Sequence, residues 1–198
     1  MLEFEQDITK EQQKENRIIE ATRDILYAIG ENPDKEGLLD TPKRVARMYN
    51  EIFSGYAIDP KEYLNRQFES ATSQQMIVVR DIPFYSTCMH HIIPFFGTAF
   101  IGYIPEKRIV TGLSKLARVV DGYSKRLQIQ EDLTFQIATA INEVLQPKGV
   151  IVVLKAEHLC MSMRGVEKPG SKTVTSFVTG VFYTDITAKE EFYENLKL

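Results

Sequence analysis

The histidines and cysteines of this chain lie in two short clusters, and these residue types are the ones that bind soft metal ions. The 198-residue sequence contains three histidines and two cysteines. Cys88, His90 and His91 form the first cluster, and His158 and Cys160 form the second. Scattered structural residues would not be expected to collect in this way. The pattern therefore predicts one metal site that joins the two clusters.

Residue spacing limits the ligand set without fixing it. A thiolate at position 88 and an imidazole at position 91 can reach one metal ion from a turn, and positions 158 and 160 share a face if they lie in a strand. Two cysteines and one histidine would leave the fourth tetrahedral position open, which is the catalytic pattern, and this donor set favours zinc. Spacing alone does not decide between His90, His91 and His158 as the third ligand.

The histidines left over would be available for proton transfer beside the metal, because an imidazole titrates near neutral pH. Zinc would lower the pKa of a bound water to about 7 and so supply a nucleophile. Two other interpretations are a closed structural site with His90 or His158 as a fourth ligand, and a set of buried cysteines with locally satisfied histidines.

A second set of polar residues has helical spacing. Ser114 and Arg118 are four residues apart and share a helix face, with Lys115 beside them. Free backbone N–H groups at a helix start would add to such a cluster, which suits phosphate; the alternative is a solvated helix face. Arg164, shortly after Cys160, and Arg44 are further candidate cations.

Glu131 is a candidate for purine recognition. It follows two glutamines at the predicted start of a helix, where a carboxylate also complements the helix dipole. A buried carboxylate facing a purine would accept from the N1–H and the exocyclic amine of guanine. Both interpretations remain open at this point.

The predicted elements have the order strand, strand, helix, helix, strand, strand. Strands are expected over 76–79, 98–104, 150 to about 161, and 174–183, and helices over 113–123 and 133–145. Residues 84–94 match neither pattern, and a short helix is expected over 188–196. This order predicts an α+β fold with an antiparallel four-stranded sheet and two helices on one face.

The N-terminal part has a different pattern. Residues 7–56 predict two helices, the first closed by Gly30 and the second beginning around Thr41. We therefore expect an N-terminal helical region over 1–70, containing a helical hairpin, and a catalytic domain over 71–198.

Composition excludes some classes of function. The chain is 43% hydrophobic with a net charge of −3, whereas a nucleic-acid-binding protein is usually strongly basic. No secretory signal and no apolar run of about 20 residues is found, so we expect no membrane partner and a cytoplasmic location. In that reducing compartment a disulfide between the two cysteines is not expected.

Five segments together resemble GTP cyclohydrolase I in order and spacing. The resemblance covers about residues 18–183. The segments are 39–46 (LDTPKRVA), 86–91 (STCMHH), 112–118 (GLSKLAR), 128–131 (QIQE) and 158–165 (HLCMSMRG).

The resemblance implies a tunnelling fold, zinc as the cofactor and GTP as the substrate. The products would be 7,8-dihydroneopterin triphosphate and formate, at the first step of tetrahydrofolate or pterin biosynthesis. It also implies a homo-oligomer, a decamer with active sites at subunit interfaces. The implied metal ligands are Cys88, His91 and Cys160, with His90 and His158 in proton transfer. The residues implied to bind substrate are Arg44, Ser114, Lys115, Arg118 and Arg164 for ribose and triphosphate, and Glu131 for guanine.

One position departs from the family pattern, which reads Cys-Glu-His-His where this chain has Met89. A carboxylate there could orient an imidazole or carry protons, and a thioether can do neither. The alternatives are therefore a related tunnelling-fold purine-nucleotide hydrolase with an altered or incomplete reaction, and a non-catalytic zinc-stabilised assembly module.

Overall fold

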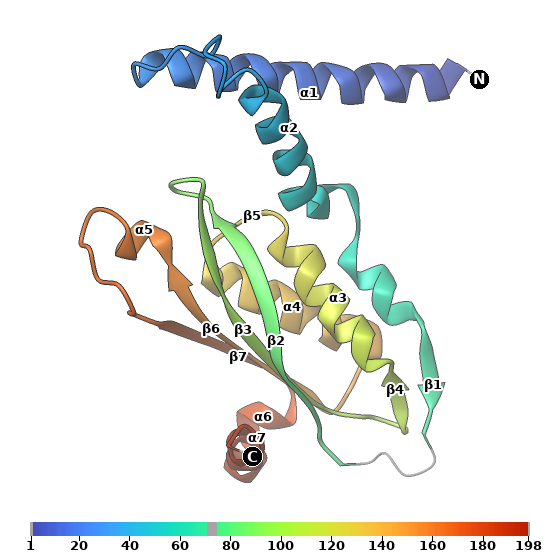
Figure 1. The fold of residues 1–198 in the computed structure, drawn as a ribbon. Coiled ribbons are helices and arrows are strands. Elements are labelled where there is room, and N and C mark those ends of the chain that lie inside the picture. Colours follow the sequence, from blue (N-terminus) through green and yellow to red (C-terminus); the bar gives the residue numbers. More distant parts are fainter. Residues whose placement is uncertain (1, 71–74, 198) are drawn as a thin grey trace. The chain divides into compact units, whose positions relative to one another are not determined.

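Residues 2–70 and 75–197 are described by the computed structural model of the chain, which divides into two units between Ser54 and Gly55. The first unit holds α1 (Leu2–Ala28) and α2 (Thr41–Ile52), which pack against each other (Figure 1). These helices confirm the two predicted in the N-terminal part of the sequence. No helix in the described part of the chain is long and apolar enough to cross a membrane.

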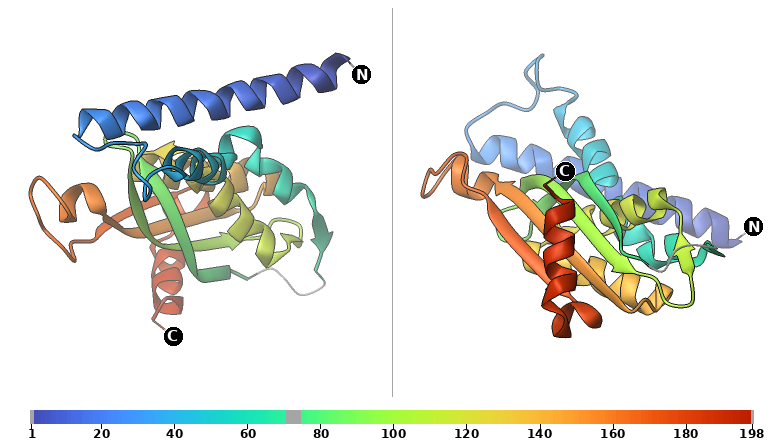
Figure 2. Two further views of the ribbon diagram at one scale, coloured as in Figure 1. Left: turned by 45° about the horizontal axis from the view of Figure 1, so that its top comes forward. Right: turned by 90° about the horizontal axis from the view of Figure 1, so that it is seen from below.

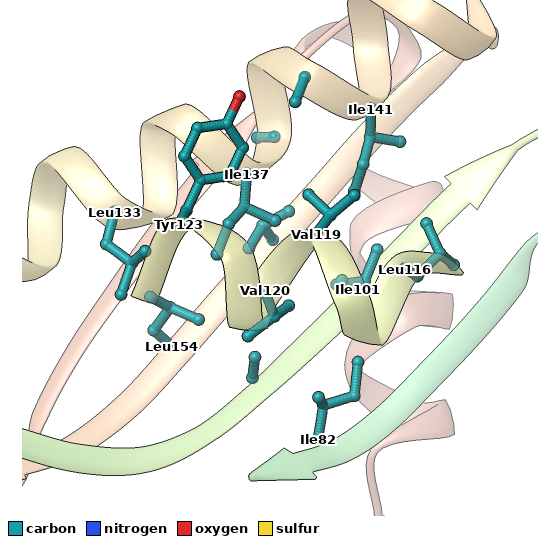
Figure 3. Packing of buried hydrophobic residues seen from close by; sticks show 14 of the residues in the cluster. Ile82, Ile101, Leu116, Val119, Val120, Tyr123, Leu133, Ile137, Ile141 and Leu154 are labelled. Carbon is teal, nitrogen blue, oxygen red and sulfur yellow. The ribbon is translucent and has the colours of Figure 1, made fainter. Parts of the chain in front are cut away.

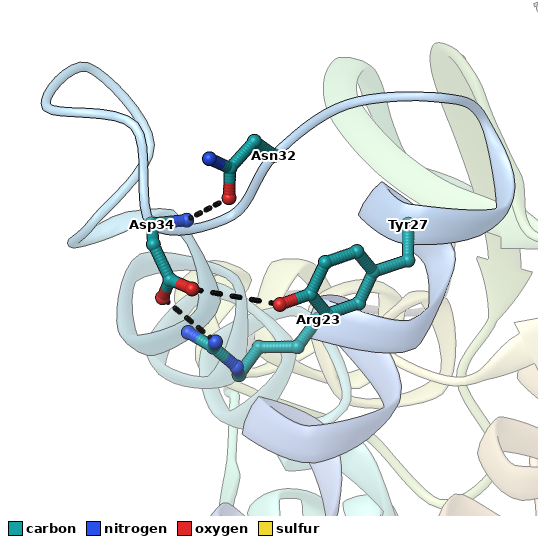
Figure 4. Close-up of polar contacts among 4 residues, drawn as sticks. All are labelled: Arg23, Tyr27, Asn32 and Asp34. Atoms are coloured by element: carbon teal, nitrogen blue, oxygen red, sulfur yellow. Dashed lines mark hydrogen bonds and ion pairs between the residues drawn. The ribbon is translucent and has the colours of Figure 1, made fainter.

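The loop between α1 and α2 folds back onto α1. Gly30 adopts a left-handed conformation with φ +89° after α1 ends. Arg23 forms an ion pair of 2.8 Å with Asp34, and the Tyr27 hydroxyl lies 3.5 Å from the same carboxylate (Figure 4). The backbone N–H of Asp34 donates to the side chain of Asn32 at 2.9 Å, so the loop has a defined turn.

The second unit is built on a five-stranded sheet with the order β5-β2-β3-β6-β7 (Figure 1). Its four long strands are antiparallel, which confirms the predicted four-stranded sheet. They are β2 (Ile77–Cys88), β3 (Ile93–Ile104), β6 (Gly149–His158) and β7 (Thr173–Val178). The short β5 (Leu127–Gln128), which the sequence pattern did not predict, pairs in parallel with the end of β2.

Two 3₁₀ helices and a small two-stranded sheet connect the chain to this unit. The 3₁₀ helices η1 (Ser54–Ala57) and η2 (Pro60–Asn65) precede β1 (Gln67–Glu69), which pairs with β4 (Ile109–Thr111). Leu64 of η2 is fully buried in the main core of the sheet unit.

Helices cover both faces of the sheet. The predicted pair, α3 (Leu113–Ser124) and α4 (Gln130–Leu145), packs on one face over the main core (Figures 1 and 3). The short α6 (Val181–Thr184) and α7 (Ile186–Asn195) pack on the other face (Figure 2). Phe182 and Phe192 are buried there. Alternating residues of β6 enter the two cores, which explains why that strand is apolar along most of its length.

The prediction that residues 84–94 are irregular was wrong. β2 continues to Cys88 and β3 begins at Ile93, so only a four-residue turn separates the strands. Pro83 obscured the strand pattern, because proline is normally excluded from a central strand. It is tolerated here because β5 pairs only with the last two residues of β2, which leaves most of β2 as an edge.

Two predicted strands were too long. β6 ends at His158 and is followed by α5 (Leu159–Ser162), and β7 ends at Val178 before α6. Gly180, with φ +56°, turns the chain between β7 and α6. In both places an apolar run continues through a change of element, which hydrophobic pattern alone cannot locate.

Candidate metal and active site

Three potential metal ligands converge at one end of the sheet. Cys88 is the last residue of β2, His91 lies in the turn that follows, and Cys160 lies in α5. Their ligand atoms all lie within 4.8 Å of one another. A tetrahedral zinc ion with ordinary bond lengths would place such atoms roughly 3.5–3.8 Å apart, so the donors need only a small adjustment to bind it.

The turn between β2 and β3 presents the histidines. The N–H of Ile92 donates to the Cys88 carbonyl at 2.9 Å, and the N–H of Met89 donates to the Gln128 carbonyl at 3.1 Å. Ile92 has φ +54°, an uncommon conformation for a β-branched residue. The metal-binding turn is therefore tied to β5 and carries local backbone strain.

The local geometry of the second cluster differs from the prediction. We expected His158 and Cys160 to share a face of one strand, but the strand ends at His158 and Cys160 lies in α5. The change from strand to helix turns the Cys160 thiol toward Cys88 and His91, while His158 is held by a different set of contacts.

The structure distinguishes the three histidines. The Nδ1 atoms of His90 and His91 lie 3.8 and 3.9 Å from the Cys88 sulfur. Only His91 joins the cluster that also contains Cys160, as far as the described residues go. The remaining nitrogen of His91, Nε2, lies 3.2 Å from the guanidinium of Arg164.

The chemistry of this donor set fits zinc. Burial raises the pKa of the Cys160 thiol, and the neighbouring Cys88 raises it further because two thiolates repel each other. A bound divalent cation removes this penalty by pairing with both sulfurs. Two thiolates and one imidazole therefore form a zinc site with three protein ligands.

His158 lies beside the metal cluster in a tightly packed environment. Its Nε2 lies 2.7 Å from the side-chain oxygen of Gln130, and its ring stacks on Phe95 with centroids 4.6 Å apart and planes 3° apart. Burial lowers the pKa of His158, while the carboxylate of Glu131 acts in the opposite direction. Glu131 itself is exposed in the first turn of α4.

Sequence reasoning missed the role of Gln130. This residue is 1% exposed and bridges α4 to β6, β7 and His158. The available signal was its place in the segment 128–131, but an amide neither titrates nor binds zinc, so nothing marked it as part of the site.

The candidate phosphate-binding residues are not all brought together. Arg164 contacts His91, although it lies beyond the end of β6 at His158. Ser114, Lys115 and Arg118 lie in the first half of α3, at the end next to β4 (Figure 1). The metal turn lies near the other end of α3, where the chain enters β5.

Two of the candidate cations have partners in the structure. The guanidinium carbon of Arg118 lies 5.9 Å from the centre of the Tyr63 ring. Arg44 lies in α2, in the first unit of the chain, and its guanidinium lies 3.6 Å from the carboxylate of Asp40.

Known proteins resemble the chain along most of its length. The family model of GTP cyclohydrolase I matches residues 18–197. GTP cyclohydrolase 1 of Carboxydothermus hydrogenoformans is 60% identical over 171 residues, covering 86% of this chain and 88% of the relative. GTP cyclohydrolase 1 of Clostridioides difficile is 56% identical over 175 residues, covering 88% of this chain and 92% of the relative.

One solved structure was also found to be similar. The archaeosine synthase QueF-Like in the apo form is 17% identical and aligns with a TM-score of 0.45, over 56% of this chain and 97% of that chain. The family model carries the conclusion, since residues 18–197 include both zinc-ligand clusters. This chain is an α+β protein of tunnelling fold and belongs to the GTP cyclohydrolase I family.

Proposed function

We propose specific roles for the residues of this site in the conversion of GTP to dihydroneopterin triphosphate, which is the activity of this chain as a family member. Cys88, His91 and Cys160 hold the zinc ion, which when bound acts as a Lewis acid and activates water. The convergence of these three donors beside His158 is the observation that carries the proposal.

His158 and His90 move protons during opening of the imidazole ring of guanine and release of formate from C8. Both histidines lie close to the metal ligands but are available for chemistry. His158 is held by Gln130 and Phe95, and His90 is exposed with Nδ1 3.8 Å from the Cys88 sulfur. An imidazole near neutral pH can both accept and return a proton.

Glu131 anchors the guanine. Its carboxylate is exposed in the first turn of α4 and is near enough to His158 to influence the pKa of that ring. A carboxylate accepts two hydrogen bonds side by side, which matches the N1–H and exocyclic amine of guanine. Adenine does not offer this pair of donors, so the contact would provide base specificity.

Arg164 binds the triphosphate once the metal is present. In the structure its guanidinium lies next to Nε2 of His91. When Nδ1 of His91 is a metal ligand, the ring proton is on Nε2, and a guanidinium can no longer donate to it. Arg164 then becomes free to bind an anion. Ser114, Lys115, Arg118 and Arg44 are the other proposed phosphate and ribose contacts.

A complete site requires a second copy of this chain. Ser114 and Lys115 lie at the beginning of α3, whereas Cys88 lies near its end. A helix of 12 residues is about 18 Å long, so one copy holds these groups at opposite ends of α3, which supports a site shared between copies. We infer a homo-oligomer, most simply the decamer, in which residues 71–198 of two copies supply the catalytic groups.

The metal-replete protein should be incubated with GTP and the products identified by mass and by pterin fluorescence after oxidation. The wild-type protein is expected to give formate and dihydroneopterin triphosphate. His158→Ala and His90→Ala are expected to retain zinc, measured by metal analysis, and to lose most turnover. Cys160→Ser serves as the control that loses zinc and activity together.

Two results would contradict the proposed roles. If both histidine variants lose zinc and dissociate, these histidines are structural and the site resembles a closed assembly module. If a ring-opened intermediate accumulates in the wild-type protein, the chain catalyses only the first part of the reaction. A mixture of Cys88→Ser and Lys115→Ala subunits tests the shared site, because only mixed oligomers would regain activity.

A further inference from the structure

The contact between Gln130 and His158 sets the proton position on the His158 ring. We propose that Gln130 is a positioning residue, which keeps the proton of neutral His158 on Nε2 and leaves Nδ1 as the proton-accepting nitrogen. The proposal rests on the proposed function of His158 in proton transfer. Its structural basis is a hydrogen-bond arrangement that permits only one orientation of the Gln130 amide.

The two ends of the Gln130 amide are distinguished by their partners. The nitrogen lies 3.1 Å from the Leu154 carbonyl and 3.2 Å from the Thr173 carbonyl. Both partners are oxygens that only accept, so this end must be the NH₂ group. The other end, which lies 2.7 Å from Nε2 of His158, is therefore the oxygen, and an oxygen acceptor requires a proton on Nε2.

The hydrogen bonds of two threonine hydroxyls lead independently to the same orientation of the Gln130 amide. The Thr134 hydroxyl donates to the backbone carbonyl of Gln130 at 2.7 Å, and it lies 2.6 Å from the Thr175 hydroxyl. Because the Thr134 proton is already used, the Thr175 hydroxyl must donate to Thr134. The Thr175 oxygen is then left to accept from the Gln130 nitrogen, 3.0 Å away. Flipping the amide would break this sequence of donors and acceptors.

The ring of His158 is also fixed in its plane. His158 and Phe95 are paired positions of β6 and β3, and their rings stack with an interplanar angle of 3°. Gln130 is 1% exposed, so water does not compete for its amide. Stacking sets the plane of the imidazole, and the hydrogen bond sets which edge faces Gln130. Together they fix a single tautomer and a single ring orientation.

The direct test is the protonation state of the two ring nitrogens. The zinc-loaded protein, labelled with ¹⁵N-histidine, contains only three histidines, and His158 is assigned by its absence from His158→Ala. The ¹⁵N spectrum of neutral His158 should show a protonated Nε2 and an unprotonated Nδ1. A proton on Nδ1 in the wild-type protein would overturn the inference.

Gln130→Met removes the oxygen acceptor with little change in side-chain volume. Its His158 signal is expected to become a mixture of tautomers. The kcat should fall about 10- to 100-fold, as for lost partners of metal-bound histidines, because the ring loses its fixed orientation together with its fixed proton position. The KM for GTP and the bound zinc should not change, because the Gln130 amide is hydrogen-bonded to Leu154, Thr173, Thr175 and His158 rather than to a metal ligand or to Glu131.

Gln128→Met is the matched control. Gln128 is also a buried amide, at the end of β5 just before α4, but its nitrogen donates to the Tyr123 carbonyl and the Gln136 side chain, and not to His158. It should lose stability in the same way while keeping the His158 tautomer and kcat. An equal fall of kcat in both variants would mean that Gln130 is only structural, which overturns the inference.

Failure of this inference and failure of the proposed function give different results. If His158→Ala retains the wild-type kcat, His158 has no proton-transfer role, and the proposed function of that residue fails. If Gln130→Met loses the tautomer but retains the wild-type kcat, while His158→Ala abolishes turnover, only the inference about Gln130 fails. If the wild-type tautomer is Nδ1–H while His158→Ala still abolishes turnover, the role of His158 stands and only the inference about Gln130 fails.

Discussion

His158 and the pair His90 and His91 are held in different ways. His158 lies at the end of a central strand, stacked on a fully buried phenylalanine and hydrogen-bonded to a buried glutamine. His90 and His91 lie in an exposed turn that is anchored mainly by its own backbone and by one hydrogen bond to β5. The core therefore orients one side of the site, whereas the metal has to organise the other.

This difference has a chemical reason. His158, for which we propose a role in proton transfer, keeps one geometry because it packs against the core, whereas His90, the other proposed proton carrier, lies in the same turn as the metal ligand His91. A metal ligand can instead be drawn into place by the metal, since binding energy offsets the cost of ordering a few turn residues. Each prediction below changes one side of the site and leaves the other as a reference.

Removal of zinc should have the largest effect, and its structural effect should be confined to the turn between β2 and β3. Chelation is expected to abolish turnover completely and to speed amide hydrogen exchange at residues 89–92. Exchange at Gln130 and along β6 should stay slow, because the core does not depend on the metal. Added zinc should restore both properties, and equal loss of protection in β6 would show that the metal supports the whole sheet.

Phe95→Ala should lower the unfolding free energy and loosen the packing that holds His158. Phe95 is fully buried, so its removal is expected to cost about 3–5 kcal/mol of unfolding free energy, measured by denaturant unfolding. Phe96→Ala, the next residue on the opposite face of β3, should cost less because Phe96 is only half-buried. A smaller effect at Phe95 than at Phe96 would mean that the stacked ring does not support the site.

Ile92→Gly tests the strain in the turn. Ile92 has φ +54°, which costs an ordinary residue about 1–2 kcal/mol, while glycine adopts it freely but has a less favourable folding entropy. The metal-free protein should therefore become more stable by up to about 1 kcal/mol. Ile93→Gly, at the first position of β3, should be destabilising, and a loss of stability at Ile92 as well would show that its side chain matters more than its backbone.

Met89→Glu should have the smallest effect. Met89 is 47% exposed and its backbone, not its side chain, makes the hydrogen bond to β5, so stability should change by less than about 0.5 kcal/mol. Bound zinc should not change either. Product analysis then measures the effect on the reaction alone. A change in the ratio of ring-opened to final product would show that the carboxylate acts in the step after ring opening.

Much of the fold and the metal site could be predicted from the sequence, because each depends on residue types with a strong signal. Clustering of scarce cysteines and histidines indicated one metal site, and the family resemblance selected its ligands. Apolar periodicity indicated α3, α4 and parts of the long strands. The position of Cys160 in a helix was missed because an apolar run continues across the end of β6. Gln130 was missed because its role depends on which groups surround it in space.

The separation of the metal ligands along the chain has a consequence for folding order. Cys88 is the last residue of the first long strand, and Cys160 follows the third, so the pairing of β2, β3 and β6 is what brings the thiols together. In a zinc finger the ligands are near in sequence, and metal binding is itself the folding reaction. Here the long-range pairing comes first. Zinc would therefore enter a nearly finished sheet, and metal uptake would report that folding is complete.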